Sequence, residues 1–441
     1  MNTMTKPNSS LMPMLIIGAL FFIFGFITWL NGALIPFLQI VCDLTETQAL
    51  FVAFSFYIAY VVMALPMAYV LERSGYKNAM VLGLLLIATG CLLFIPAAQS
   101  HTFAVFLIAQ FIVGTGLTIL QTASNPYIVK VGPQETAAVR ISIMGLLNKG
   151  AGVIAPVAFT ALVLGEFKGV TAKAVAAMAD AERIAQIESL ANGLIQPYLG
   201  MAIVLIILAL LLKKSSLPEL NLEEETDTHE AGNNIEKTSI TQFPQLILGV
   251  LALFMYVGVE VIAGDTIGLF GSQLGVANAT SLTSYTMAFM VLGYLLGLVL
   301  IPRFLKQHQA LTGSAVLGII FSLLVVFSSQ TDTGVSDLLW GWMGVQSLPN
   351  TITYVALLGF ANAMVWPAVW PLALDGLGKF TPKGSALLIM GIAGGAILPI
   401  VYGTLSDHTD GQSAYWMMLP CYFIILFYAL KGCHMRQWSN K

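Results

Sequence analysis

The chain has 441 residues, of which 57% are hydrophobic and only 9% are charged, and its mean hydropathy is +0.84. Soluble domains carry about 25% charged residues, so this composition excludes an ordinary soluble domain and predicts a chain that lies in a lipid bilayer. A net charge of −3 leaves no basic patch, which argues against nucleic acid as a partner. The four cysteines show no paired or C-x-x-C spacing, so neither a disulfide framework nor a zinc site is indicated.

Apolar runs of about 20 residues are long enough to cross the hydrocarbon core of a bilayer, and the chain holds twelve of them. They lie at 13–40, 47–71, 78–98, 102–131, 141–165, 194–213, 245–271, 279–301, 310–328, 351–377, 384–405 and 413–431. The first run is longer than a signal peptide and is expected to stay as the first span. The sequence therefore predicts an all-α polytopic membrane protein with twelve transmembrane helices.

The distribution of Lys and Arg predicts the orientation of these spans. With a cytoplasmic N-terminus, 15 of the 19 cationic residues fall in cytoplasmic segments, while Lys168, Lys173 and Arg183 fall outside and Lys149 lies at membrane depth. Cytoplasmic loops carry the excess of positive charge. We therefore expect a multi-pass protein of the bacterial inner membrane with both termini in the cytoplasm.

Two hydrophilic stretches interrupt the apolar runs. Residues 165–192 are rich in Ala and Glu at helical spacing and predict a short amphipathic helix on the outer face. Residues 213–242 are acidic and poor in apolar side chains, which predicts a cytoplasmic linker with little fixed structure. The predicted organisation is an N-terminal six-helix bundle (1–213), a linker (214–243) and a C-terminal six-helix bundle (244–441).

The two predicted bundles resemble each other. GAGVIAPV at 150–157 in span five matches AGGAILPI at 393–400 in span eleven, and each follows a polar turn that holds a proline. Spans four and ten both carry interior Asn and Pro residues. Parallel repeats of this kind place a substrate site near the bilayer midplane, between two pseudo-symmetric bundles that rock against each other.

Several polar residues stand at membrane depth in spans four and five: Gln121, Asn125, Asn148 and Lys149. The amides either line a wet cavity or form interhelical hydrogen bonds. The lysine costs roughly 2.5–3.5 kcal/mol at that depth, so it needs a counter-charge or water.

Span seven carries two carboxylates, Glu260 and Asp265, and a carboxylate at this depth is a functional hypothesis by default. Two interpretations of Glu260 remain open: a ligand of the transported molecule, or the counter-ion of Lys149, which requires the two halves to meet there. Asp375, near the inner end of span ten, is expected in a cytoplasmic gate with Lys379 or Lys383.

A sugar site in a membrane protein needs amides and carboxylates for hydroxyls and an indole face for the apolar side of the ring. The candidates are Trp29, Asn31, Gln121, Asn148, Glu260, Asp265, Asn362, Trp366 and Trp370. The last three recur every fourth residue, which stacks them along one helix face, although Pro367 and Pro371 can kink it. The alternatives that remain open are anchoring of tryptophan at the membrane interface and an interhelical hydrogen bond for Asn362.

No nucleotide-binding or metalloprotease motif is present, so we expect no cofactor and a transport energy supplied by an ion gradient. A membrane enzyme acting on lipid-linked sugars would need an acidic cluster in an outer loop, for which Asp332 and Asp337 are the candidates. A non-transporting sugar sensor would normally carry a sizeable cytoplasmic domain.

Particular segments resemble known transporters. VLERSGYK at 70–77 resembles a degraded loop signature of the major facilitator superfamily. More specific are LNGALIP at 30–36, QTASNP at 121–126, YVGVE at 256–260, LALDGLG at 372–378 and GGAILP at 394–399, which resemble the fucose–galactose–glucose symporter family. The resemblance implies a twelve-helix fold that imports a hexose or deoxyhexose together with a cation.

The chain also departs from that family. Fucose permease has an aspartate where Gly32 stands and a glutamate where Gln121 stands, and those carboxylates are tied to proton coupling; Asn148 matches a polar position implicated in sugar binding. Similar glucose transporters use sodium. We therefore expect a monomeric secondary active importer of a glucose-, galactose- or fucose-type hexose, with sodium favoured over proton coupling and uncoupled transport as a further alternative.

The resemblance and the residue pattern together define the expected sites. The expected substrate-binding residues are Asn31, Gln121, Asn125, Asn148, Lys149, Glu260, Asn362, Trp366 and Trp370. The expected ion-coupling residues are Glu260, Asp265 and Gln121, with sodium as the one metal ion that could bind.

Overall fold

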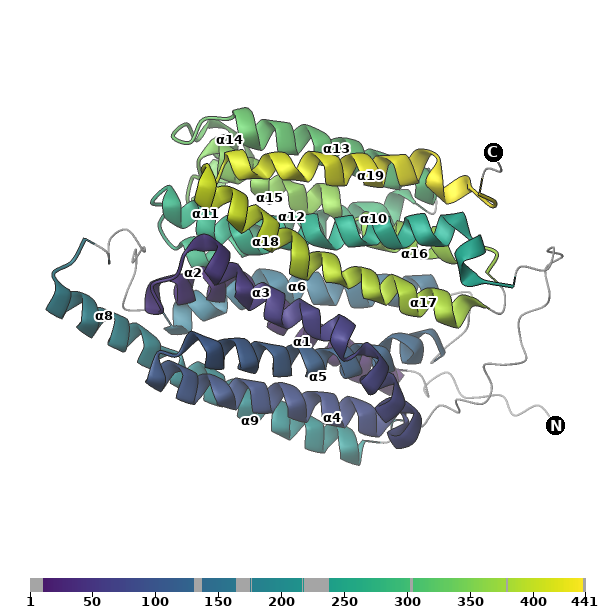
Figure 1. Cartoon of the computed structure of the whole chain (residues 1–441), viewed down its shortest axis with the longest axis horizontal. Helices are drawn as coiled ribbons and strands as arrows, with labels where there is room; N and C mark the ends of the chain where they lie inside the picture. The colour runs from purple at the N-terminus through teal and green to yellow at the C-terminus, as the bar shows by residue number, and fades with distance from the viewer. Residues whose placement is uncertain are drawn as a thin grey trace.

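A computed structural model describes residues 11–130, 137–163, 175, 177–215, 217, 238–301, 304–377 and 380–438. Within these ranges the chain forms helices and turns and no strands (Figure 1). Eleven helices in the described part are long and apolar enough to cross a membrane. Backbone polar groups find no water in lipid, and a helix satisfies them internally. The predicted all-α polytopic fold is confirmed.

The first half of the chain forms eight helices in its described ranges. They are α1 (Leu11–Trp29), α2 (Asn31–Val41), α3 (Glu46–Val62), α4 (Ala64–Ser100), α5 (Phe103–Lys130), α6 (Ala137–Val163), α8 (Asp180–Gly193) and α9 (Ile195–Lys214). Helix α8 lies within the stretch predicted to be an amphipathic helix, with Leu190 and Ala191 buried and Ile184 exposed.

The second half begins with the short helix η4 (Ile240–Gln242). The helices and short helical turns that follow are α10 (Pro244–Val261), η5 (Ile262–Thr266), α11 (Ile267–Gln273), η6 (Ala279–Ser281), α12 (Thr283–Leu300), α13 (Gln307–Phe327), α14 (Gly334–Trp340), η7 (Gly341–Met343), α15 (Asn350–Asn362), α16 (Val365–Leu374), α17 (Thr381–Met390), η9 (Gly391–Ala393), α18 (Gly394–His408), η10 (Ser413–Met417), α19 (Met418–Leu430) and η11 (Gly432–His434). Residues 218–237 of the predicted linker lie outside the described ranges.

The twelfth predicted span is α3, an apolar helix of 17 residues that is shorter than the other eleven and is extended by the start of α4. Gly75 has φ 76° and ψ 167° and breaks α4 into two helices that meet at a turn. Glycine adopts a positive φ without the steric cost of a Cβ atom. The part of α4 before Gly75 continues α3 as the second span, and the part after it is the third span.

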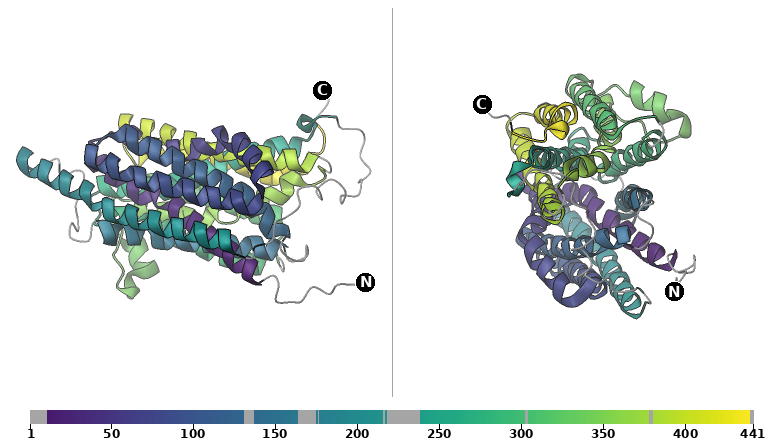
Figure 2. Two further views of the ribbon diagram at one scale, coloured as in Figure 1. Left: turned by 90° about the horizontal axis from the view of Figure 1, so that it is seen from below. Right: turned by 90° about the vertical axis from the view of Figure 1, so that its right-hand side faces the viewer.

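The helices gather into two bundles, seen end-on in Figure 2, with α1–α9 on one side and α10–α19 on the other. Helix α1 begins and α19 ends at the same end of the assembly, which we call the near end; the opposite end is the far end (Figure 2). This arrangement agrees with an even number of spans.

Several membrane helices are interrupted near their middle. The first span breaks at Leu30, the seventh contains the π-helical turn η5, and the tenth breaks at Ala363 and Met364. Interrupted helices place free backbone groups and irregular side-chain directions at membrane depth, as transporters do around a bound substrate.

The two halves are bonded to each other at the far end. The Asp407 carboxylate, near the end of α18, accepts the backbone N–H groups of Glu46 (3.1 Å) and Thr47 (3.2 Å) at the start of α3. The Ser406 hydroxyl donates to the Glu46 carboxylate. A carboxylate at a helix N-terminus satisfies unpaired N–H groups and complements the helix dipole, so these contacts hold α3 against α18.

At the near end, Asp375 forms an ion pair with Arg436 beyond α19, and its backbone carbonyl accepts a hydrogen bond from the side chain of Gln245 (3.1 Å). Of the two predicted partners of Asp375, Lys379 lies outside the described residues, and the partner that the structure gives this carboxylate is Arg436 rather than Lys383. The segment after α19 therefore supplies a cation at the end of α16.

Candidate functional site

An ion pair joins the two halves at the centre of the molecule. The Lys149 ammonium on α6 lies 2.7 Å from a carboxylate oxygen of Glu260 on α10, and both residues are at least nine-tenths buried. Two charges leave water at a cost of several kcal/mol each, which their mutual attraction must offset. Of the two interpretations left open for Glu260, the structure supports the counter-ion of Lys149.

Trp29 lies beneath the lysine. The ammonium nitrogen sits 4.5 Å from the centre of the indole ring, within range of a cation–π interaction. Gly152 and Gly264 pack directly on the ring: a Cβ at either position would lie 2.6 Å from a ring atom. Trp29 is 2% exposed, so it supports Lys149 and lines no open surface in this conformation.

A row of aromatic rings leads away from Glu260. Tyr256 precedes Glu260 by one turn of α10, and its ring centroid lies 6.3 Å from that of Trp366; Trp366 and Trp370 are 5.5 Å apart. Both tryptophans are half-buried, and the indole N–H of Trp370 has no hydrogen-bond partner. The rings offer apolar faces beside a charged pair.

Asn362 does not continue this row. It ends α15, before the break at Ala363 and Met364, and its side-chain oxygen accepts a hydrogen bond from Tyr422 on α19 (2.9 Å). The predicted stacking of three residues on one face holds for the two tryptophans alone, because the helix is interrupted before them. The other side of the Asn362 amide, its NH2 group, is buried without a partner.

On the N-terminal side, Gln121 of α5 donates to the Tyr60 hydroxyl on α3 (2.9 Å) and remains half-buried. The rings of Tyr60 and Tyr57 stack with centroids 6.3 Å apart. Asn125, one turn beyond Gln121, is also half-buried. Tyr57 reaches the C-terminal half, because a Cβ on Gly395 of α18 would lie 3.2 Å from its ring.

Asn148 precedes Lys149 on α6. Its side-chain nitrogen donates at 3.5 Å, a long distance, to the carbonyl of Phe21 on α1. The two helices touch through their backbones, since a Cβ on Gly25 would lie 1.9 Å from the Asn148 carbonyl oxygen. Asn148 is half-buried, so its amide is available beside the central ion pair.

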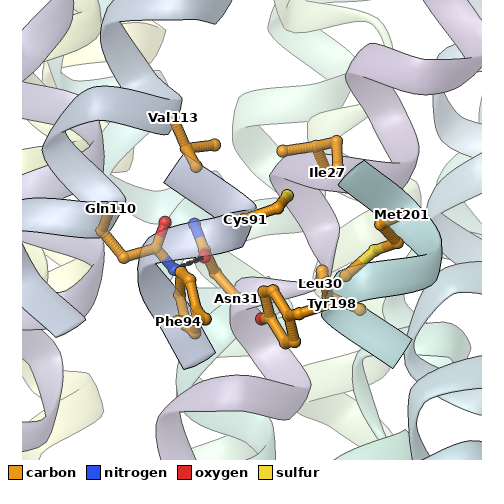
Figure 3. A pocket seen from close by; sticks show the side chains of 9 residues that line it. All are labelled: Ile27, Leu30, Asn31, Cys91, Phe94, Gln110, Val113, Tyr198 and Met201. Carbon is orange, nitrogen blue, oxygen red and sulfur yellow. Dashed lines mark hydrogen bonds between the residues drawn. The ribbon is translucent and has the colours of Figure 1, made fainter. Parts of the chain in front are cut away.

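Asn31 lies apart from this centre, inside the N-terminal bundle. The Gln110 side chain donates to its side-chain oxygen (2.8 Å), and both are buried (Figure 3). They line a cavity of about 10 Å³ between α1, α2, α4, α5 and α9, which is at the lower limit of room for one water molecule. The unpaired Asn31 NH2 group suits such a water, and the cavity is too small for a sugar.

Asp265 lies in η5 and is fully buried, and neither of its carboxylate oxygens has a hydrogen-bond partner among the described residues. Around it, Thr283 and Thr286 of α12 donate to the carbonyls of Gly264 (2.6 Å) and Ala263 (3.0 Å). These bonds satisfy the carbonyls that the π-helical turn frees, while the Asp265 side chain remains unsatisfied.

The outer-loop acids Asp332 and Asp337 hold the loop together. Asp332 accepts the Asn350 side-chain amide (2.7 Å), and Asp337 accepts the hydroxyls of Thr333 (2.8 Å) and Ser347. The hydrogen bonds from Ser347 and Thr333 hold the pKa of Asp337 below its usual value. A stabilised, hydrogen-bonded carboxylate is poorly suited to act as a general base.

Four residues with a part in these contacts were not among the sequence candidates: Tyr57, Tyr60 and Tyr256 at the centre, and Gln110 beside Asn31. Tyr256 had a readable signal, because it lies four residues before Glu260 and so shares its helix face. The tyrosines of α3 and Gln110 act through partners on other helices, which the spacing of residues within one helix does not identify.

Comparisons with known proteins place the fold. The family model described as Major Facilitator Superfamily matches residues 17–392. The chain belongs to this superfamily. This agrees with the resemblance of the loop at 70–77 and with the two-bundle architecture.

The curated relatives are named as transporters and not as enzymes. A glucose/galactose transporter of Brucella abortus (strain 2308) is 34% identical over 418 residues, covering 94% of this chain and 92% of the relative. A putative glucose/galactose transporter of Helicobacter pylori (strain J99) is 30% identical over 94% of this chain and 95% of its own length. The L-fucose-proton symporter of Escherichia coli is 26% identical over 96% and 94%.

Solved structures confirm the fold. The crystal structure of the E. coli fucose:proton symporter superposes with a TM-score of 0.68 at 23% sequence identity, covering 96% of this chain and 98% of that one. The chain thus has the fold that the resemblance implied.

Proposed function

We propose that this chain is a secondary active transporter that imports a hexose of the glucose or galactose type into a bacterial cell, coupled to a cation, with sodium favoured over the proton. The central Lys149–Glu260 pair between the two halves carries the proposal. The names and extents of the glucose/galactose transporter relatives support the substrate class.

The groups around the pair suit a sugar. A pyranose presents hydroxyls on its rim and an apolar face, and the half-buried Trp366 and Trp370 offer that face a stacking surface beside Glu260. The Gln121 and Asn148 amides, both half-buried, are available from the opposite half. In this assignment the sugar lies between the bundles and bonds to both.

Alternating access follows from the same geometry. With the termini in the cytoplasm, as the positive charges of the sequence favour, the far end faces outward. It is closed by the hydrogen bonds that Asp407 and Ser406 of α18 form with Glu46 at the start of α3. Opening that end requires these bonds to break and the bundles to rock about the central ion pair.

The test is uptake of labelled glucose, galactose and fucose into proteoliposomes that contain the purified chain. Under an inward sodium gradient at fixed pH we expect accumulation of one of the hexoses, and replacement of sodium by choline should remove it. A proton gradient without sodium provides the comparison arm. Glu260→Gln should lower uptake more than tenfold, whereas Glu188→Ala, on exposed α8, should leave it unchanged.

No uptake of any hexose under either gradient would contradict the proposal. Binding of a sugar to the purified chain without uptake would instead support a sensor.

A further inference from the structure

Within the described part of the chain, nothing neutralises the carboxylate of Asp265. It is 0% exposed, and both of its oxygens are buried there without a hydrogen-bond partner. A bare carboxylate in an apolar interior is strongly unfavourable unless it binds a proton or a cation. Its neighbour Glu260 differs, since Lys149 already neutralises that side chain.

The π-helical turn explains why the two acids interact. Residues five apart on an α-helix differ in direction by about 140°, since each residue turns the helix by about 100°. In a π-helical turn the hydrogen bonds join residues five apart, so η5 brings Asp265 toward the face that carries Glu260. The two carboxylates interact electrostatically. π-Helical turns of this kind occur frequently at functional sites.

The turn also lies where the two halves meet. It packs against α2 of the N-terminal half and against α12, α15 and α18 of its own half. Gly32 of α2 approaches so closely that a Cβ there would lie 1.9 Å from the Thr283 hydroxyl, which itself bonds to Gly264 in the turn. Tyr57 of α3 also reaches the C-terminal half, since a Cβ on Gly395 of α18 would lie 3.2 Å from its ring.

We propose that Asp265 is the carboxylate that binds the coupling monovalent cation, a sodium ion or a proton. This inference rests on the proposed function and deepens it. A cation at Asp265 places positive charge near Glu260 and weakens the attraction that holds Lys149 there. The Glu260 oxygens are then free to accept sugar hydroxyls, which links cation binding to sugar binding.

The two ions make different demands on the site. A proton needs one of the free Asp265 oxygens. A sodium ion needs several oxygen ligands, of which the Asp265 carboxylate supplies two. The titratable groups that interact with Asp265 are Glu260 and Tyr57, and Lys149 is linked to it through the ion pair with Glu260.

The experiment compares Asp265→Asn with wild type and with Asp180→Asn, a matched substitution at an exposed acid at the start of α8. Accumulation of labelled hexose in proteoliposomes is measured under a sodium gradient and, separately, under a proton gradient. We expect Asp265→Asn to lose accumulation at least tenfold with the ion that drives wild type, and Asp180→Asn to stay within twofold of wild type. The gradient that drives hexose accumulation by wild type identifies the coupling ion.

A second measurement reports cation binding directly. Saturation with the driving cation should raise the Tm of purified wild type by about 2–5 °C, and Asp265→Asn should lose this shift while its own Tm stays at or above the cation-free wild-type value. Three results would each overturn the assignment. They are hexose accumulation by Asp265→Asn within twofold of wild type, a cation-dependent rise in Tm that Asp265→Asn retains, and failure of Asp265→Asn to fold. Absence of cation-driven uptake in wild type would instead contradict the proposed function.

Discussion

The two halves carry their buried polar groups in different forms. In the N-terminal half the amides of Gln110 and Gln121 each donate to a side chain of the same half. Among the described residues, both halves keep some buried polar atoms without a partner, but those of the N-terminal half, on Trp29, Asn31 and Ser124, are neutral, whereas the C-terminal half leaves both oxygens of the Asp265 carboxylate unpartnered. Buried polar groups are almost always hydrogen-bonded, and an unpaired charge costs far more than an unpaired neutral group. The comparison indicates that the C-terminal bundle, unlike the N-terminal one, holds a buried acid that needs a partner from outside it.

Lys149 is the exception in the N-terminal half, because its partner Glu260 belongs to the other half. Removing it should produce the largest effect. We expect Lys149→Ala to cost about 3–5 kcal/mol of stability, since the Glu260 carboxylate stays buried without its counter-ion. Thermal unfolding of the purified protein in detergent measures the loss.

The matched control for this prediction is the double substitution Lys149→Met with Glu260→Gln, which removes both charges together. It should recover most of the stability, because no uncompensated charge remains. A single variant as stable as wild type would show that the pair does not hold the halves together.

The second prediction tests whether the amides of the N-terminal half are structural. Gln110→Ala leaves the Asn31 side-chain oxygen without its donor and should cost about 1–3 kcal/mol. The Tm should fall, while the ratio of cation to sugar transported should not change. If Gln110→Ala folds normally and yet abolishes uptake, the Asn31–Gln110 pair belongs to the transport site and the contrast between the halves fails.

The smallest effect is expected at the far end. Asp407→Ala removes the carboxylate that caps α3 and should cost about 0.5–2 kcal/mol, which favours separation of the halves there. Opening of the far end can be measured with a cysteine at Leu50, introduced into a variant without other cysteines. Leu50 is fully buried and contacts Gly403 of α18.

In that background, Asp407→Ala should raise the labelling rate of the new cysteine by an impermeant thiol reagent roughly fivefold for each kcal/mol. Glu188→Ala, an exposed acid on α8, serves as the control and should leave the rate unchanged. An unaltered rate in Asp407→Ala would mean that the bond to α3 does not restrain opening.

Hydropathy predicted the number of spans and the all-α fold, because lipid requires long apolar helices. The helix breaks were harder to predict. Pro367 and Pro371 marked span ten, yet the break lies at Ala363 and Met364, and nothing in the periodicity of span seven indicates a π-helical turn. Such a turn depends on how neighbouring helices pack, which one sequence does not reveal.

The candidate site shows the same division. A buried lysine needs a counter-charge, and pairing with Lys149 was one of the two roles considered for Glu260. Choosing between those roles required knowing that α6 meets α10. Arg436 was not among the predicted partners of Asp375, because it reaches this carboxylate only after the chain folds back beyond α19. The composition of single helices identified the polar residues, and tertiary packing determined their partners.

The ion pair between Lys149 and Glu260 also has an electrical consequence. Moving one elementary charge through a membrane potential of 100 mV changes the free energy by about 2.3 kcal/mol. Two opposite charges that travel as one neutral unit experience no such work. Reorientation of the bundles with the pair intact therefore carries no net current through these two residues, and the membrane voltage acts on the cycle only where the pair separates or another ion joins it.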